Sequence, residues 1–106
     1  MNQLLDELAE FVGPENVISG DALADRNPGF CTTSQDAACL VRPESTEQLS
    51  QIARYASCSG HSLVPQGGLT GLVNGTATTQ QNIIVSMELM AEVIRVDPVQ
   101  NVLIAQ

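Results

Sequence analysis

The run from Pro65 to Gly71 is the part of the chain whose residue types and spacing best support chemistry. It reads Pro65-Gln66-Gly67-Gly68-Leu69-Thr70-Gly71, so three glycines lie within five residues, directly after the apolar segment 62–64. Glycine reaches positive φ at low cost and has no side chain that would hold a ligand away from the backbone. Such a loop can direct several backbone N–H groups at one anion, and a phosphate or pyrophosphate is the natural ligand.

Two better-known phosphate-binding motifs are excluded. A P-loop requires Lys after its last glycine, and this chain contains no Lys. The dinucleotide fingerprint Gly-x-Gly-x-x-Gly fails because Leu69 stands where the middle glycine belongs. The alternative to a binding loop is an ordinary glycine-rich turn between two elements. The place of the loop in the predicted fold bears on that choice.

Residues 38–64 predict a βαβ unit. An apolar strand at 38–41 is followed by Ser45-Thr46-Glu47-Gln48, which has the pattern of a capping box, and by a helix that ends at Gly60. Residues 62–64 form the next strand, and a crossover of this length makes the two strands parallel with a right-handed connection. Ligands of open α/β sheets bind at the carboxyl ends of such strands. Because the glycine loop lies there, we favour an anion site over a simple turn.

The flanking segments complete a predicted α/β (α+β) fold. Apolar residues at positions 4, 5, 8, 11 and 12 have helical spacing, and Gly13-Pro14 ends that helix. Residues 19–37 predict an irregular connection with one short turn at 21–25. Beyond the loop, we expect a strand at 83–86, a turn with Met87 and Met90 packed inward, and a hairpin of 93–96 and 102–105 around turn formers.

Composition limits the remaining functions. The 106 residues provide one compact core, and 12 acidic residues against four Arg give a formal charge of −8. This charge disfavours nucleic acid and anionic membranes as partners. A bound phosphate must therefore be held by backbone dipoles or by an isolated Arg. Arg42 and Arg95 lie in strand-like segments and Arg54 in a helix-like one, so none is placed at the loop by the pattern alone.

The three cysteines predict neither a disulfide framework nor a metal site. Cys31, Cys39 and Cys58 are odd in number and lack Cys-x-x-Cys spacing. The N-terminus is acidic and amphipathic, unlike a signal peptide, and no apolar run is long enough to form a transmembrane segment. We therefore expect reduced thiols and a cytoplasmic setting.

From position 40 to 106, the order of motifs resembles the N-terminal part of the FAD-binding domain of vanillyl-alcohol oxidase (PCMH-type) flavoproteins. The branch it is most similar to contains D-lactate dehydrogenase, the glycolate oxidase flavin subunit and D-2-hydroxyglutarate dehydrogenase. The resemblance rests on Val41-Arg42-Pro43 with Ser45-Thr46-Glu47, Val64-Pro65-Gln66-Gly67-Gly68, Thr70-Gly71-Leu72-Val73, Ile84-Val85-Ser86-Met87, and the hairpin through Asp97-Pro98.

The resemblance implies a cofactor and its binding residues. Gln66 to Gly71 would wrap the FAD pyrophosphate through main-chain N–H groups, and Ser86-Met87, with the neighbourhood of Pro43, would border the adenosine and flavin ends. The loop contains no His, so the FAD is expected to be noncovalent. The full set of expected cofactor-binding residues is Pro65, Gln66, Gly67, Gly68, Leu69, Thr70, Gly71, Leu72, Ser86 and Met87.

The implied activity belongs to a larger protein. The intact flavoenzyme would oxidise a small 2-hydroxy acid by hydride transfer to FAD, with its substrate bound by a further domain and its electron acceptor left open. Residues 1–37 would be a leading helix and connection, and 38–106 the pyrophosphate-binding part of a domain truncated at its C-terminus, where the chain stops after an apolar strand. We expect no catalytic residue and no metal ligand here, and His61 serves a turn or a helix dipole.

Two alternatives stay open at this point. The chain is either part of such an enzyme or a non-catalytic remnant that acts as a nucleotide-binding or interaction module, and a generic nucleotide binder is a third interpretation. In each case, the isolated chain is expected to bind FAD weakly or not at all, because it lacks the segments that would cover the rings.

Overall fold

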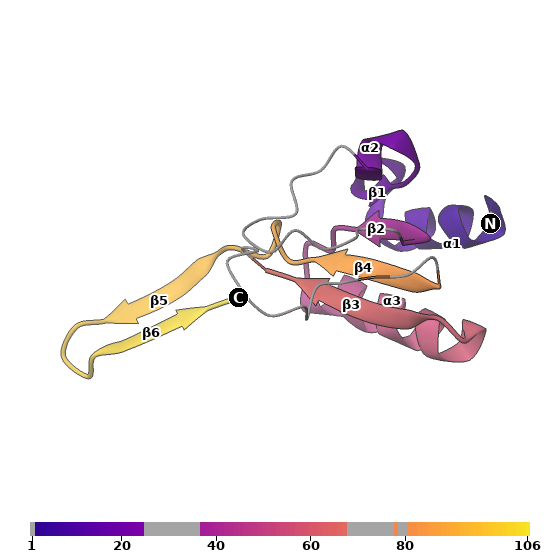
Figure 1. The fold of residues 1–106 in the computed structure, drawn as a ribbon. Coiled ribbons are helices and arrows are strands. Elements are labelled where there is room, and N and C mark those ends of the chain that lie inside the picture. The colour runs from indigo at the N-terminus through magenta and orange to yellow at the C-terminus, as the bar shows by residue number, and fades with distance from the viewer. Residues whose placement is uncertain (1, 25–36, 68–77, 79–80) are drawn as a thin grey trace.

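The computed structural model describes residues 2–24, 37–67, 78 and 81–106, and it is a mixed α/β structure (Figure 1). Its elements, in chain order, are α1 (Asn2–Val12), the 3-10 helix η1 (Pro14–Asn16), β1 (Val17–Ile18), α2 (Asp21–Ala24), β2 (Cys39–Val41), α3 (Thr46–Ser59), β3 (Ser62–Gln66), β4 (Asn82–Ser86), β5 (Val93–Asp97) and β6 (Val102–Ala105). Among the described residues, no helix is both long enough and apolar enough to span a bilayer.

Four strands form one sheet in the order β1-β2-β4-β3, and β5 pairs with β6 in a separate hairpin. β2 and β3 both run parallel to β4, so the predicted parallel arrangement of the βαβ unit is confirmed. The two strands are not neighbours, because β4 lies between them. The carboxyl ends of all three parallel strands therefore meet at one edge, which we call the carboxyl edge and which consists of Arg42, Gln66, Gly67, Ser86 and Met87.

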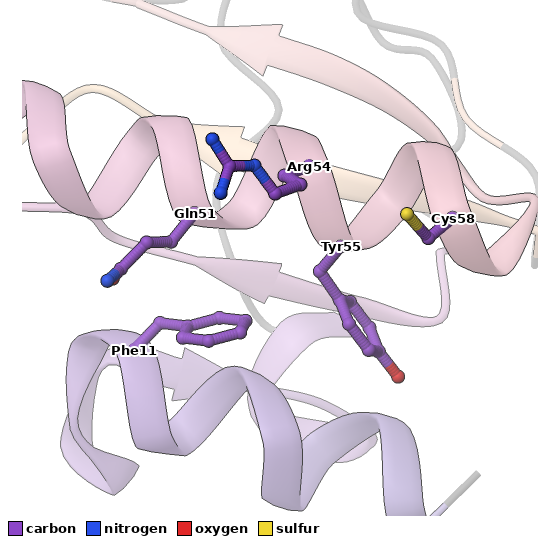
Figure 2. Close-up of a pocket in the computed structure, with 5 residues that line it drawn as sticks. All are labelled: Phe11, Gln51, Arg54, Tyr55 and Cys58. Atoms are coloured by element: carbon purple, nitrogen blue, oxygen red, sulfur yellow. The ribbon is translucent and has the colours of Figure 1, made fainter.

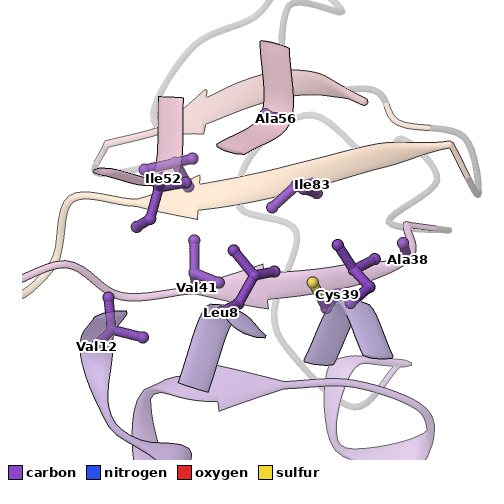
Figure 3. Close-up of a cluster of buried hydrophobic side chains, with 10 residues drawn as sticks. Leu8, Val12, Ala38, Cys39, Val41, Ile52, Ala56 and Ile83 are labelled. Atoms are coloured by element: carbon purple, nitrogen blue, oxygen red, sulfur yellow. The ribbon is translucent and has the colours of Figure 1, made fainter. Parts of the chain in front are cut away.

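The main core lies between this sheet and the two long helices (Figure 3). The predicted N-terminal helix is α1, and its apolar stripe of Leu4, Leu8 and Val12 is buried against the strands. Helix α3 contributes Ile52 and Ala56 to the same cluster. On the strands, alternate residues face these helices, namely Cys39 and Val41 of β2 and Ile83 and Val85 of β4.

Helix α3 begins and ends where its caps predict. The Ser45 hydroxyl accepts a hydrogen bond of 3.2 Å from the Gln48 backbone N–H. The Gln48 side chain accepts one of 2.8 Å from the Glu44 N–H, so it reaches back past the N-cap residue. At the other end, Gly60 has φ 79°, and its N–H bonds to the Ala56 carbonyl. Both ends of the crossover helix are thus fixed by local chemistry.

The opposite face of the sheet carries a smaller cluster of Leu23, Leu40 and Ile84. Leu23 comes from α2, which occupies most of the stretch where we predicted one short turn at 21–25. Strand β1, which the sequence pattern did not reveal, pairs antiparallel with β2. It has only two residues, and periodicity cannot identify a strand that short.

The hairpin of β5 and β6 confirms the predicted turn and extends away from the sheet (Figure 1). The Asp97 carboxylate accepts hydrogen bonds from the N–H groups of Val99 and Gln100, at 3.0 and 3.1 Å. Asn101 closes the turn at φ 56°, in the left-handed region that Asn tolerates. The apolar side chains of the hairpin are exposed, namely Val93, Ile94, Val96, Val99, Val102, Leu103 and Ile104.

Candidate functional site

The carboxyl edge brings together part of the predicted binding site. Gln66 and Ser86 are register partners at the ends of adjacent parallel strands. The Met87 N–H donates a hydrogen bond of 2.9 Å to the Gln66 carbonyl, which joins the two strand ends. Pro65 and Gly67 flank Gln66 in the chain. The other predicted residues, Gly68, Leu69, Thr70, Gly71 and Leu72, lie outside the described residues.

Pro65 and Gln66 lie in β3, whereas the sequence interpretation placed them in the loop. Proline is tolerated because β3 is an edge strand, where one side of the backbone needs no hydrogen-bond donor. In a strand, the N–H and C=O of one residue point to the same side. Since the Gln66 carbonyl bonds to the Met87 N–H at the end of β4, its own N–H also points to β4. Because the Gln66 N–H is directed at β4, the predicted main-chain contacts with an anion are those from Gly67 to Gly71, and they stay a prediction.

The side chains of Gln66 and Ser86 stand on the sheet face opposite α3. Leu63 of β3 packs against the helix-side core, and successive side chains of a strand alternate between faces. Gln66, three positions later, therefore points to the other face, as does Ser86, which follows the helix-facing Val85. Met87 packs against the helix-side core. Two of the predicted binding residues thus present their side chains to one surface, and Met87 presents its side chain to the other.

The two side chains on that surface differ in their hydrogen bonding. The Ser86 hydroxyl donates a 2.8 Å hydrogen bond to the Glu88 carboxylate. Gln66 is only 2% exposed, and its side-chain nitrogen Nε2 has no hydrogen-bond partner in the described part of the chain. A buried donor without a partner costs free energy, so such groups are rare unless a ligand completes them. Sequence reasoning missed this side chain, although its place at the end of a parallel strand was a usable signal.

Gly67 has no structural need to be glycine. Its φ lies outside the left-handed region, and a Cβ built on it would meet no atom of the described residues within 4 Å. Neither backbone strain nor packing therefore excludes a side chain at this position. Open space beside a bare backbone at the end of a parallel strand is what the close approach of a pyrophosphate requires.

The described part of the carboxyl edge offers little positive charge. Arg42 follows β2; its Nη2 donates a 2.9 Å hydrogen bond to the Glu15 carbonyl of η1, and its buried Nε has no hydrogen-bond partner among the described residues. Arg95 pairs with Asp97 on the hairpin, and Arg54 lies on α3. Of the described arginines, Arg42 is therefore the one that lies on the carboxyl edge, beside the neutral N–H donors at the end of β3.

The remaining reactive side chains lie away from the carboxyl edge. His61 precedes β3, and its Nδ1 is 3.3 Å from the Gln81 carbonyl, at the opposite end of the strands. Cys39 and Cys58 are free thiols, and burial raises the pKa of Cys39 to about 11. The third cysteine, Cys31, lies outside the described residues. In the described ranges, no group of His, Cys, Asp and Glu is arranged to bind a metal.

A hollow of about 320 Å³ lies between α1 and α3 (Figure 2). It is lined by Phe11 of α1 and by Gln51, Arg54, Tyr55 and Cys58 of α3. The rings of Phe11 and Tyr55 meet edge to face with their centroids 6.0 Å apart. All of its lining residues come from helices on the face opposite the Gln66 side chain. This hollow is therefore separate from the carboxyl edge.

Comparison with known sequences points to one family. The profile of the family described as "FAD binding domain" matches residues 37–106. The chain is 38% identical over 87 residues to the mitochondrial D-2-hydroxyglutarate dehydrogenase of Danio rerio, and the match covers 81% of the chain and 16% of that relative. It is 31% identical over 99 residues to the corresponding Arabidopsis thaliana protein, covering 92% of the chain and 18% of the relative. The chain thus spans less than a fifth of these relatives.

Solved structures share the fold at low sequence identity. p-Cresol methylhydroxylase superposes with a TM-score of 0.74 at 16% identity, over 92% of this chain and 20% of that one. Alkyldihydroxyacetonephosphate synthase gives a TM-score of 0.76 at 18% identity, again over 92% of this chain and 20% of the other. At these identities, the likeness establishes the fold and not the activity.

Proposed function

This chain belongs to the FAD binding domain family, and from that membership we propose that its carboxyl edge and the following glycine loop bind the pyrophosphate of a noncovalent FAD. The observation that carries the proposal is the pair of features at the end of β3. Gln66 has a buried amide nitrogen without a protein partner, and Gly67 has open space where a side chain would stand. Within the part of the chain that the structure describes, both features fit a ligand that approaches the backbone closely and accepts hydrogen bonds.

Each part of the chain has a separate role in this proposal. Backbone N–H groups from Gly67 to Gly71 donate to the phosphate oxygens, because the edge offers few cationic side chains. Ser86 and Met87 border the cofactor, and the Ser86 hydroxyl, already bonded to Glu88, fixes the end of β4. Residues 38–106 form the pyrophosphate-binding part, while 1–37 supply the leading helix. The buried core beneath the sheet keeps the two strand ends in register.

For the whole flavoprotein, we propose oxidation of a small 2-hydroxy acid. The names of the relatives support this substrate class, since the Danio rerio and Arabidopsis thaliana proteins are D-2-hydroxyglutarate dehydrogenases. When bound, FAD supplies the acceptor for the hydride of the substrate. The residues that bind and deprotonate the substrate would lie in other segments. The names of these relatives place them in mitochondria, and our proposal for this chain is a reducing compartment, the cytoplasm, in which Cys39 and Cys58 stay as thiols.

The test is a titration of the purified chain against a fixed low concentration of FAD, followed by the anisotropy of flavin fluorescence, with ATP as competitor. We expect weak binding, with a Kd above about 1 μM, because most of the ligand surface stays in water. We also expect FAD to be preferred to ATP. Displacement of FAD by equimolar ATP would instead favour a generic nucleotide binder, and no binding at millimolar concentrations would rule out flavin binding by this chain.

One observation favours a second function, that of an interaction module. Val96 and Leu103 are register partners on the hairpin, and both are about 61% exposed. A two-stranded ribbon with exposed apolar side chains is stable only when other surfaces cover them. If FAD binding fails and the chain forms stable complexes that Val96→Lys with Leu103→Lys abolishes, the interaction module becomes the better explanation.

A further inference from the structure

We propose that the side-chain amide of Gln66 is a binding residue in its own right and donates a hydrogen bond from Nε2 to a pyrophosphate oxygen of FAD. The inference rests on the proposed function and deepens it. The backbone loop alone would require only glycines, whereas this residue adds a side-chain donor. The donor has a defined place at the last position of β3.

The side-chain amide nitrogen of Gln66 is buried and unpaired in the described structure. Gln66 is 2% exposed, so its amide has lost nearly all contact with water. Its Nε2 nevertheless has no hydrogen-bond partner among residues 2–24, 37–67, 78 and 81–106. Buried side-chain nitrogens are almost always satisfied, so one left without a partner calls for an explanation. A ligand that accepts the bond supplies one.

The backbone of Gln66 is directed at β4, and its side chain lies on one face of the sheet. The backbone of Gln66 is committed to the sheet, because its carbonyl accepts from the Met87 N–H at 2.9 Å. Its side chain stands on the face opposite α3, beside its register partner Ser86. The Ser86 hydroxyl already donates to Glu88. Of these two side chains at the ends of β3 and β4, Gln66 therefore has the donor that is still available.

The carboxyl edge has few positively charged side chains among the described residues. Arg95 pairs with Asp97 on the hairpin, and Arg42 donates from Nη2 to the Glu15 carbonyl of η1, while its buried Nε has no hydrogen-bond partner among the described residues. A neutral amide donor satisfies a phosphate oxygen without a counter-charge, and a hydrogen bond to a charged acceptor is stronger than one between neutral groups. The polar end of Gln66 thus has the chemistry that this ligand needs.

The experiment compares Gln66→Met with wild type. Methionine keeps the length of the side chain and removes the donor. We expect the FAD Kd to rise about 10- to 100-fold, because a hydrogen bond to a charged group is lost. Inorganic pyrophosphate should lose affinity by a similar factor. The urea midpoint of the ligand-free protein should stay the same or rise, because the Nε2 donor that is removed has no hydrogen-bond partner among the described residues.

A matched control uses Gln51→Met, the same change at an exposed glutamine of α3 on the other face of the sheet. It should leave FAD affinity unchanged. A lower urea midpoint or loss of folding in Gln66→Met would overturn the inference, since it would mean that the amide has a structural role. Unchanged FAD affinity, or a loss for FAD without one for pyrophosphate, would also overturn it.

The side-chain NH₂ of Gln66 provides a direct readout besides affinity. In ¹⁵N–¹H spectra its two resonances should shift on addition of FAD and be missing in Gln66→Met. If the backbone amides from Gly67 to Gly71 shift while the Gln66 side chain does not, the pyrophosphate site stands and this inference fails. If neither moves at millimolar FAD, the proposed function fails as well.

Discussion

Replacing Gly67 by alanine should separate ligand binding from folding. A Cβ at this position would meet no described atom within 4 Å, and φ lies outside the left-handed region, so we expect the folded chain to accept the methyl group without strain. The substitution also lowers the entropy of the unfolded chain. We therefore expect the free energy of unfolding to stay constant or to rise by about 0.4–1 kcal/mol, measured by urea denaturation.

The same methyl group should weaken FAD binding. It occupies the space through which the pyrophosphate would approach the backbone, and overpacking of a well-fitted contact typically costs about 1–3 kcal/mol. That cost corresponds to a rise in Kd of roughly 5- to 150-fold. Titration of the variant against FAD, followed by flavin fluorescence anisotropy, measures it. A Gly67→Ala variant that binds FAD as tightly as wild type would refute the claim that a ligand uses this open space.

Gly60→Ala is the matched control. Gly60 also has no atom within 4 Å of a Cβ, but its φ of 79° is strained for alanine. This variant should lose stability, by about 1 kcal/mol, because it disrupts the C-cap of α3. Its FAD affinity per folded molecule should not change. Gly67→Ala should therefore weaken FAD binding without a loss of stability, whereas Gly60→Ala should lose stability without a loss of FAD affinity.

The remaining predictions concern a helix cap, the glycine loop and the buried thiol. Ser45→Ala should lower the free energy of unfolding by about 1 kcal/mol through loss of the α3 cap and should retain FAD binding, as shown by urea denaturation and FAD titration. Gly68→Asp should weaken FAD binding at least about 100-fold while far-UV circular dichroism stays the same, because like charges ~4 Å apart repel by ~4 kcal/mol at an effective dielectric constant of ~20; retained affinity would contradict the pyrophosphate assignment. Burial raises the pKa of Cys39 from 9.0 to about 11, so the folded state favours the neutral thiol. The contribution of Cys39 to the free energy of unfolding should therefore be complete below pH 9 and be lost as the pH rises through 11. Cys39→Ala should lack this decline, and a thiol reagent should modify the exposed Cys58 but not Cys39 in the folded chain and find three thiols after denaturation.

Local signals predicted much of the fold. The α3 helix begins at Ser45 and ends at Gly60 as expected, because both caps depend on a few neighbouring residues. The turn of the hairpin was also predictable, since Asp97 bonds to N–H groups two and three positions later. The parallel direction of β2 and β3 followed from the length of the crossover between them.

Local sequence signals could not predict the features that depend on contacts between distant segments. The sequence does not show that β4 lies between β2 and β3, because strand order depends on packing between distant segments. Pro65 suggested the start of a loop, yet β3 continues through it because this strand is at the edge of the sheet. The extension to Gln66 turns its backbone toward β4 and leaves its side chain as the available donor.

The central claim is that the end of β3 and the following glycines hold the pyrophosphate of FAD, and the most direct measurement is a ¹⁵N–¹H map of the chain titrated with FAD. The account predicts shifts of the backbone amides from Gly67 to Gly71, together with those of Ser86 and Met87. No shifts are expected around the hollow between α1 and α3, where Phe11 and Tyr55 lie. Shifts confined to that hollow, with the end of β3 unchanged, would contradict the account.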